Sequence, residues 1–175
     1  MDSIFRSWLE CQRAEATLLA AESDILTLLP GPGSPPQDYL ARFESPTLVR
    51  DGGAVTQRTG FEVLVHFPPD YLRSVPDPVR VVALLAPRTA WHPNVRPPFV
   101  CLGNIAPGTS LCELLLQAFE VLTFAKLTPR EDDALNRDAC VWARGHMDLF
   151  PLAARPLRRR AVSLDVAEVA QEGPQ

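Results

Sequence analysis

The 175-residue sequence predicts an α+β fold in which a first helix, an antiparallel meander of four to five strands, a cysteine-bearing loop and two more helices follow one another. Apolar residues recur at helical spacing near the N-terminus and again after residue 110. Between these stretches, short strand-like runs are joined by connections too short for parallel crossovers. We expect one domain over residues 1–150 and a partly irregular C-terminal extension over 151–175.

The first helix is expected over residues 3–29, with Ser3 as its N-cap. Its apolar stripe would consist of Ile4, Trp8, Cys11, Leu18, Ile25 and Leu29. Prolines and glycines fill residues 30–36, and neither a helix nor a central strand tolerates such a run. That segment is predicted to be a linker or a surface loop.

Strand-like runs are predicted at residues 39–44, 46–50, 54–58, 60–67 and 79–85. Asp51-Gly52-Gly53 is typical of a hairpin turn between two of them. Along residues 61–67, apolar side chains at the odd positions alternate with Glu62 and His66. One face of that strand should therefore be buried, with His66 on the other. The run 79–85 is continuously apolar and suits the most buried strand.

The segment 91–102 brings a cysteine shortly after a His-Pro-Asn turn. Its three prolines exclude a helix and remove donors from a strand ladder, so we expect an ordered, extended surface loop. A cysteine in such a loop is reachable, whereas structural thiols are usually buried on regular elements. Cys101 is therefore the candidate reactive residue, and Asn94 is a candidate hydrogen-bond donor beside it.

A second helix should begin after Thr109-Ser110, where Glu113 fits a capping box. Its predicted buried stripe is Leu111, Leu114, Leu115, Ala118, Val121 and Leu122. An acidic turn at 129–133 precedes a third helix over 135–144, on which Cys140 and Trp142 would be core or helix-face residues. Farther on, prolines exclude a long helix, residues 158–160 form a solvated basic run, and the last dozen residues are expected to fray.

Composition excludes several classes of function. A net charge of −4 and a pI near 5.4 disfavour nucleic acid as a partner. The four cysteines lack Cys-x-x-Cys and zinc-ligand spacing, so neither a metal site nor a cofactor is expected. We find no signal peptide and no long apolar span, so we expect a cytoplasmic protein with reduced thiols and no membrane partner.

Arginine supplies 16 of the 17 basic residues, and Lys126 is the only lysine. A GC-rich genome favours arginine codons and explains such a bias. A second explanation is chemical, because an enzyme that carries an activated acyl group would modify its own amines. The two explanations are compatible.

The order of these elements, with four short motifs on them, resembles the ubiquitin-conjugating (E2) enzyme family. The motifs are Phe67-Pro68 with Asp70-Tyr71, His92-Pro93-Asn94-Val95, Val100-Cys101-Leu102, and Asp132-Asp133-Ala134-Leu135-Asn136. The resemblance covers residues 39–144 and, more loosely, the first helix. Each motif alone is weak, but all four occur in the family's order. The resemblance implies an E2-like fold and an acyl-transfer activity.

Departures from the family pattern point to one branch of it. His92 and Cys101 are one position closer than in eukaryotic members, and Pro98 replaces a usual glycine. The tryptophan that commonly follows the cysteine is missing, and the turn after Tyr71 is longer and lacks its usual proline. The C-terminal helices are expected to be shorter than in the family. Together with the scarcity of lysine, this resembles bacterial E2-like proteins. The resemblance implies that the gene lies in an operon that also encodes an E1-like enzyme, a ubiquitin-like protein and a deconjugating protease. Such operons are often linked to phage defence.

The resemblance implies a role for each candidate residue. Cys101 would accept the C-terminal acyl group of a ubiquitin-like protein from an E1-like enzyme and hold it as a thioester for an acceptor protein. Asn94 would stabilise the oxyanion that forms during transfer, or it would only cap the Pro93 turn. Asp133 would orient or deprotonate the attacking amine, or it would cap the third helix. His92 would hold the loop, a role that we prefer to that of a base for Cys101.

Two other functions stay open. An inactive E2 variant could act only as a module that binds a ubiquitin-like protein, although such variants usually lack the cysteine. An unrelated thiol hydrolase would need His92 or His146 next to Cys101. By resemblance, the polar face of the first helix with Arg6, Glu10 and Arg13 is a candidate E1-docking face, although it could equally be a solvated surface.

Overall fold

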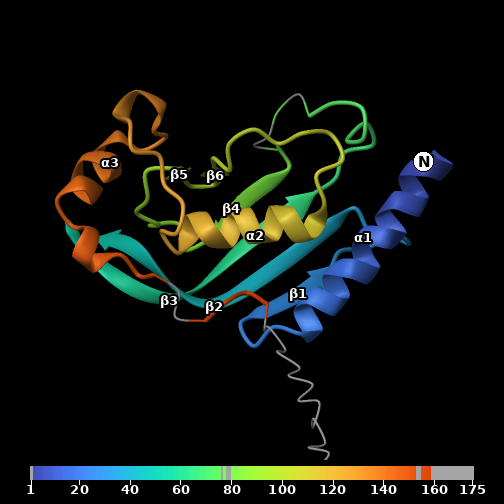
Figure 1. Ribbon diagram of the computed structural model, residues 1–175, viewed down its shortest axis with the longest axis horizontal. Coiled ribbons are helices and arrows are strands. Elements are labelled where there is room, and N and C mark those ends of the chain that lie inside the picture. The colour runs from blue at the N-terminus through green and yellow to red at the C-terminus, as the bar shows by residue number, and fades with distance from the viewer. Residues whose placement is uncertain (1, 76, 78–79, 153–154, 159–175) are drawn as a thin grey trace, which may run out of the picture.

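The computed structural model describes residues 2–75, 77, 80–152 and 155–158, which form an α+β structure (Figure 1). Six strands of the described residues make one antiparallel sheet in the order β1-β2-β3-β4-β6-β5. The strands are β1 (Leu26–Pro30), β2 (Asp38–Asp51), β3 (Ala54–His66), β4 (Val82–Ala86), β5 (Val95–Arg96) and β6 (Phe99–Val100). The helical elements are α1 (Ser3–Ala21), α2 (Leu111–Leu122), η2 (Glu131–Asp133), α3 (Arg137–Arg144) and η3 (Met147–Leu149). The α+β class is thus confirmed, with more strands than the four to five predicted.

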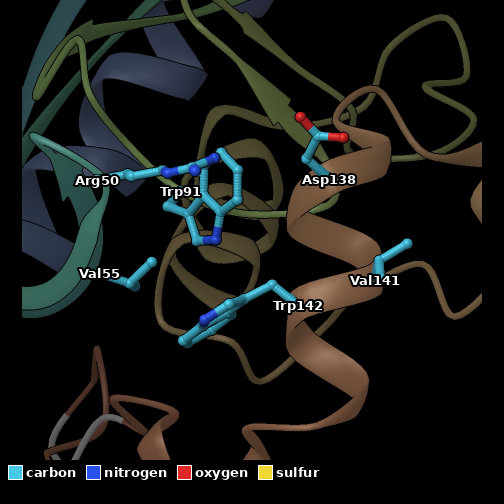
Figure 2. Close-up of a pocket in the computed structure, with 7 residues that line it drawn as sticks. Arg50, Val55, Trp91, Asp138, Val141 and Trp142 are labelled. Carbon is cyan, nitrogen blue, oxygen red and sulfur yellow. The ribbon is translucent and has the colours of Figure 1, made fainter.

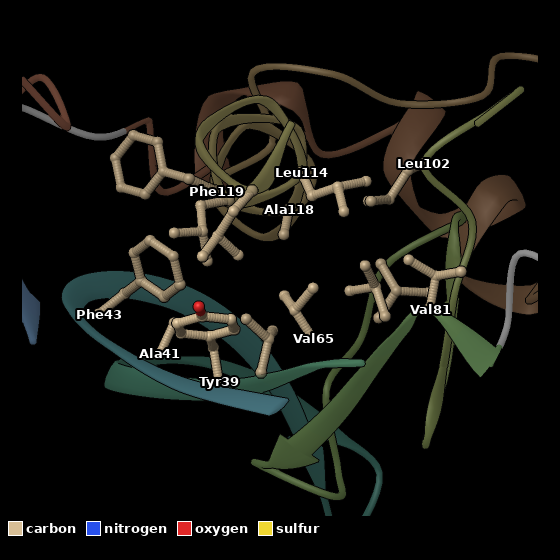
Figure 3. Close-up of a cluster of buried hydrophobic side chains, with 14 of the residues drawn as sticks. Tyr39, Ala41, Phe43, Val65, Val81, Leu102, Leu114, Ala118 and Phe119 are labelled. Carbon is tan, nitrogen blue, oxygen red and sulfur yellow. The ribbon is translucent and has the colours of Figure 1, made fainter. Parts of the chain in front are cut away.

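The hydrophobic core lies between α2 and the face of the sheet that it crosses (Figures 1 and 3). Phe119 of α2 packs against Phe43 of β2 with ring centroids 5.8 Å apart, and Ala118 points toward the sheet. The stripe predicted for this helix is confirmed, since all six of its residues are buried. The Ser110 side chain caps the helix by accepting the Glu113 N–H at 3.1 Å, as the capping pattern predicts.

The first helix differs from its prediction in length and in its buried face. It ends at Ala21 rather than at residue 29, and the predicted last turns form β1, which pairs with residues 39–43 of β2. An apolar run suits a helix and a strand alike, so the neighbouring strand decides its structure. Asp2, not Ser3, is the N-cap, and it accepts the Ile4 N–H at 2.9 Å.

The predicted stripe is only partly correct: Trp8 packs against the core and Ile25 is buried, but the face that α1 buries lies about one residue away from the predicted one. Ile4 is 70% exposed and Leu18 is 61% exposed. The residues that α1 buries are Phe5, Leu9, Gln12, Ala16 and Leu19. A glutamine and an alanine belong to this face, and a search for large apolar residues does not select them. Gln12 accepts the Leu111 N–H at 2.8 Å and so joins α1 to the start of α2.

Two long strands, β2 and β3, replace the four short ones predicted over residues 39–67. The predicted break in β2 is a register shift between Phe43 and Pro46. Gly52 and Gly53 form the two-residue hairpin turn with φ of 56° and 93°, as the sequence predicts. Apolar residues at odd positions of 61–67 are all buried, which confirms the predicted alternation, and His66 lies on the other face beside Asp38, with 2.7 Å between Nδ1 and Oδ1.

The fourth strand, β4, starts at Val82; Val79 of the predicted run 79–85 lies outside the described residues. Its buried side chains, Val82 and Leu84, are each 1% exposed, but Leu85 is 41% exposed. The strand therefore has one open face, which its continuously apolar sequence does not predict.

The cysteine segment is only in part the surface loop that its prolines predict, because Arg96, Pro98 and Phe99 are exposed but the rest is mostly enclosed or paired. Its first half is buried from His92 to Val95, and its second half forms a small hairpin of β5 and β6. Phe99 of β6 pairs with Ala83 of β4, so this hairpin extends the sheet. Each of these strands has only two residues, so the prolines between them do not have to donate an N–H to the hydrogen-bond ladder.

The third helix begins at Arg137 rather than at residue 135 and is capped by the Asn136 side chain, which accepts the Ala139 N–H at 3.1 Å. Cys140 is buried in it, and Trp142 is half-buried. Toward the C-terminus, Leu157 packs into the core, and Arg158 pairs with Glu22 at 2.6 Å instead of being only solvated. The final residues, predicted to fray, lie outside the described part. Among the described residues, no helix is both long enough and apolar enough to cross a membrane.

Candidate active site

Cys101 follows β6 directly and has a partly exposed, free thiol. Its backbone N–H donates to the Asn94 carbonyl at 2.8 Å, so the two candidate residues are joined across the β5–β6 hairpin. The next residue, Leu102, is 2% exposed and anchors the chain in the core. The sulfur thus sits where the chain leaves the sheet, on backbone that is held on both sides.

Asn94 connects the cysteine segment to the segment that follows α2. Its Oδ1 accepts the Thr128 N–H at 2.7 Å, and its Nδ2 donates to Thr128 Oγ1 at 2.8 Å and to the Cys101 carbonyl at 3.3 Å. The residue is only 5% exposed. Both amide protons are therefore engaged. The alternative role, capping of the Pro93 turn, is not the one that this side chain performs, because its partners are Thr128 and the Cys101 carbonyl and not backbone groups of that turn.

His92 is 1% exposed, and its Nδ1 accepts the Asn94 backbone N–H at 2.9 Å. The ring packs edge-on against Phe124 with centroids 4.3 Å apart. Burial lowers the pKa of His92 to about 3, and a smaller contribution from the Lys126 backbone acts in the opposite direction. The imidazole is neutral at physiological pH and is a weak base. This geometry favours the loop-holding role over that of a base for Cys101.

Asp133 lies in η2, and its side chain is 63% exposed. Its carboxylate is 3.6 Å from Arg130 Nε. The helix-capping alternative is wrong, because α3 starts four residues later with Asn136 as its cap. Asp133 is therefore available at the surface.

The segment 128–136, which carries Asp133, is fixed at both ends to the cysteine segment. At one end Thr128 binds Asn94, and at the other the Asn136 N–H donates to the Pro93 carbonyl at 3.0 Å. Arg144 holds the middle by contacting Glu131 at 2.6 Å and the Pro129 carbonyl at 3.0 Å. The cysteine segment and the acidic turn form one connected unit.

Two members of the site were missed from the sequence. Thr128 belongs to no motif, and its role depends on a contact with a residue 34 positions away. In the sequence, Lys126 stands out only as the single lysine. Its Nζ donates to the Leu102 carbonyl at 2.8 Å, immediately after Cys101. Neither contact leaves a local pattern in the sequence.

A hollow of about 470 Å³ opens beside Trp91, the residue before His92 (Figure 2). The Arg50 guanidinium lies 4.4 Å from the centre of the Trp91 ring, and Trp142 and Asp138 approach from α3. The sequence does not predict this hollow, because its walls come from three separate segments.

In the described part of the chain, no three His, Cys, Asp or Glu side chains come together in a way that could hold a metal ion. His146, the other candidate base, donates to or accepts from no cysteine in this structure; its Nδ1 lies 2.7 Å from the Trp142 carbonyl and its ring stacks on Trp142.

A comparison of the chain with models of known protein families found no match. A comparison with curated proteins found no significant match either.

Proposed function

We propose that this protein is an E2-like carrier, in which Cys101 accepts the C-terminus of a ubiquitin-like protein from an E1-like enzyme as a thioester and passes it to an acceptor. The observation that carries the proposal is the connection among Cys101, Asn94 and Thr128, with a partly exposed thiol at its edge. The order of elements also supports an E2-like version of the α+β fold: α1, the antiparallel sheet, the cysteine segment, α2, the acidic turn and α3.

The chemistry requires no strongly activated thiol. The Cys101 sulfur attacks the E1-bound acyl carbon, a new C–S bond replaces the old one, and the exchange is nearly neutral in free energy. The acceptor nucleophile then attacks the same carbon and releases the Cys101 thiol. The site has to position the thioester and stabilise the oxyanion that forms during the second step.

Asn94 first of all positions the groups around Cys101. Its amide keeps the Cys101 carbonyl and the Thr128 segment in fixed places. To donate to an oxyanion it must release one partner, and the bond to the Cys101 carbonyl is the longer of the two, at 3.3 Å against 2.8 Å. We infer that this bond exchanges during transfer. The loss of such a donor typically costs about 3 kcal/mol of transition-state stabilisation.

Asp133 is the proposed residue that orients or deprotonates an acceptor amine. Its exposure and its place on the fixed segment 128–136 support this role. Arg6, Glu10 and Arg13 are all exposed on α1 at spacings that put them on one face, and we propose this face for E1 docking.

The alternative proposal is an inactive E2 variant that only binds a ubiquitin-like protein. The full engagement of the Asn94 amide favours it, because a site without a free donor is poorer at transfer. A thiol hydrolase is disfavoured, because His92 is buried against Phe124 and His146 is held by Trp142.

A charging assay tests the proposal. The chain is incubated with ATP and with an E1-like enzyme and a ubiquitin-like protein from the same genome. We expect an adduct that a thiol reductant removes and that Cys101→Ala abolishes. Cys11→Ala is the matched control, because Cys11 is exposed on α1, away from the proposed site. Binding of the ubiquitin-like protein without any adduct would support the alternative.

A further inference from the structure

The single lysine of this chain reaches the backbone carbonyl of the residue next to the candidate nucleophile. Lys126 lies 25 positions after Cys101 in the sequence, yet its Nζ donates to the carbonyl of Leu102 at 2.8 Å. With standard backbone dimensions, this contact keeps the amine within about 9 Å of the Cys101 Cα. From there, the amine would approach a thioester on that cysteine by rotation about the lysine side-chain bonds.

The position of Lys126 is fixed by the end of α2. Phe124 has a φ of 62°, a left-handed conformation that is rare for a bulky residue, and it turns the chain away from the helix axis. The ring is 3% exposed, between His92 and Phe150, with centroid distances of 4.3 Å and 4.7 Å. The Lys126 N–H then donates to the Glu120 carbonyl at 3.0 Å. The same buried histidine that holds the cysteine segment therefore also supports the turn that directs the lysine.

We infer that Lys126 is an internal acyl acceptor, a self-modification site that takes the acyl group from the Cys101 thioester; this rests on the proposed function. The neutral amine attacks the thioester carbonyl carbon, a C–N bond forms and the C–S bond breaks. The amine loses one proton, the departing thiolate regains one, and the products are an amide on Nζ and a free thiol. No oxidant or reductant is needed, because the thioester supplies the driving force.

This inference gives the lysine bias of the sequence a specific meaning. If an activated acyl group selects against lysine, the one lysine retained is the one that the fold holds next to the residue that would carry the thioester. A modifier attached to Lys126 would cover Cys101 and block a new charging cycle. Self-acylation would then limit the activity of a carrier that meets no acceptor.

The test uses the purified full chain and a synthetic peptide ending in Gly-Gly as its 2-mercaptoethanesulfonate thioester. We expect a reductant-labile adduct on Cys101, followed by a reductant-stable adduct mapped to Lys126 by mass spectrometry. Lys126→Arg keeps a donor for the Leu102 carbonyl, and it should abolish the stable adduct while the labile one persists longer. In Cys101→Ala, acylation of Lys126 should fall at least tenfold.

A chain with its one lysine moved elsewhere is the matched control. Lys126→Arg combined with Arg6→Lys keeps one lysine, now exposed on α1, and should give no stable adduct above background. Acylation there as fast as at Lys126, or equal acylation of Lys126 in Cys101→Ala, would overturn the inference. A thioester on Cys101 without a stable adduct would overturn the inference and leave the carrier function intact. If no thioester forms in the E1 charging assay either, both the self-modification of Lys126 and the carrier function are contradicted.

Discussion

The two sides of Cys101 differ in almost every physical property. On one side lies a neutral support made of the buried residues His92, Asn94 and Phe124 and the half-buried Thr128, which are joined by short hydrogen bonds and ring contacts. On the other lies a charged rim made of Lys126, Arg130 and Asp133, which is exposed and loosely paired. The support is suited to fixing the position of the cysteine. The rim is suited to meeting other molecules.

Because of this difference, residues that determine folding stability can be separated from residues that take part in acyl transfer. Breaking a hydrogen bond in the buried support leaves polar groups without partners and costs folding free energy. Changing an exposed charge costs almost none. Variants of the support should therefore act on unfolding, and variants of the rim on transfer.

Asn94→Ala should lower the free energy of unfolding by about 3 kcal/mol, because it removes three hydrogen bonds worth about 1 kcal/mol each. Urea denaturation measures the change. Asn104→Ala is the control, since Asn104 is exposed a few residues after Cys101 and its loss should cost less than about 0.5 kcal/mol. Equal losses for the two variants would mean that the Asn94 bridge does not hold the segment.

Acid should destabilise the protein through His92. Its pKa is about 3 when folded and about 6.5 when unfolded, so the unfolded chain binds the extra proton between these values. The stability due to neutral His92 is complete above pH 6.5 and is lost as the pH falls toward 3. From pH 7 to pH 5 the loss should be about 2 kcal/mol.

Urea denaturation at both pH values checks this slope. His92→Gln should flatten it by that amount, whereas His146→Gln, at an exposed ring, should keep it. A slope that His92→Gln leaves unchanged would contradict the burial of this imidazole.

Thr128→Val should cost about 1 kcal/mol, because it removes only the hydroxyl that accepts from Asn94 Nδ2 and keeps the backbone bond to Oδ1. Thr128→Ser retains the hydroxyl and should recover most of the loss. Chemical denaturation of the two variants in parallel checks this. If serine and valine are equally destabilised, the methyl packing of Thr128 matters and its hydroxyl does not.

Asp133→Asn should change stability by less than about 0.5 kcal/mol, because the side chain is 63% exposed and its ion pair with Arg130 is loose. Transfer from charged Cys101 to free lysine should slow by about a hundredfold if the carboxylate takes the proton. Charging itself should be unchanged. Asp132→Asn, at the exposed neighbour, is the control; the same slowing there would remove the specific role of Asp133.

The sequence predicts best those features that depend on local pattern. The stripe of α2, its Ser110 cap, the Gly52-Gly53 turn and the alternation in β3 follow from spacing alone. The end of α1 does not, because residues 26–30 are apolar in either structure and only pairing with β2 makes them a strand.

The candidate site divides in the same way. Cys101 and Asn94 are linked by backbone as the His-Pro-Asn and cysteine motifs suggest, but the burial of residues 92–95 is not visible in a proline-rich segment. Thr128 and Lys126 join the site through contacts across 34 and 24 positions. Such contacts depend on how α2 ends at Phe124, and no single-sequence pattern encodes that turn.

The most direct test of the carrier function is to map the acyl group on the charged protein. After incubation with the E1-like enzyme, ATP and the ubiquitin-like protein, the chain is digested without reductant and its four cysteines are compared by mass spectrometry. We predict the modifier's C-terminal residues on Cys101, with Cys11, Cys112 and Cys140 unmodified. Occupancy of Cys11 or Cys112 equal to that of Cys101, or an adduct that survives in Cys101→Ala, would contradict the account.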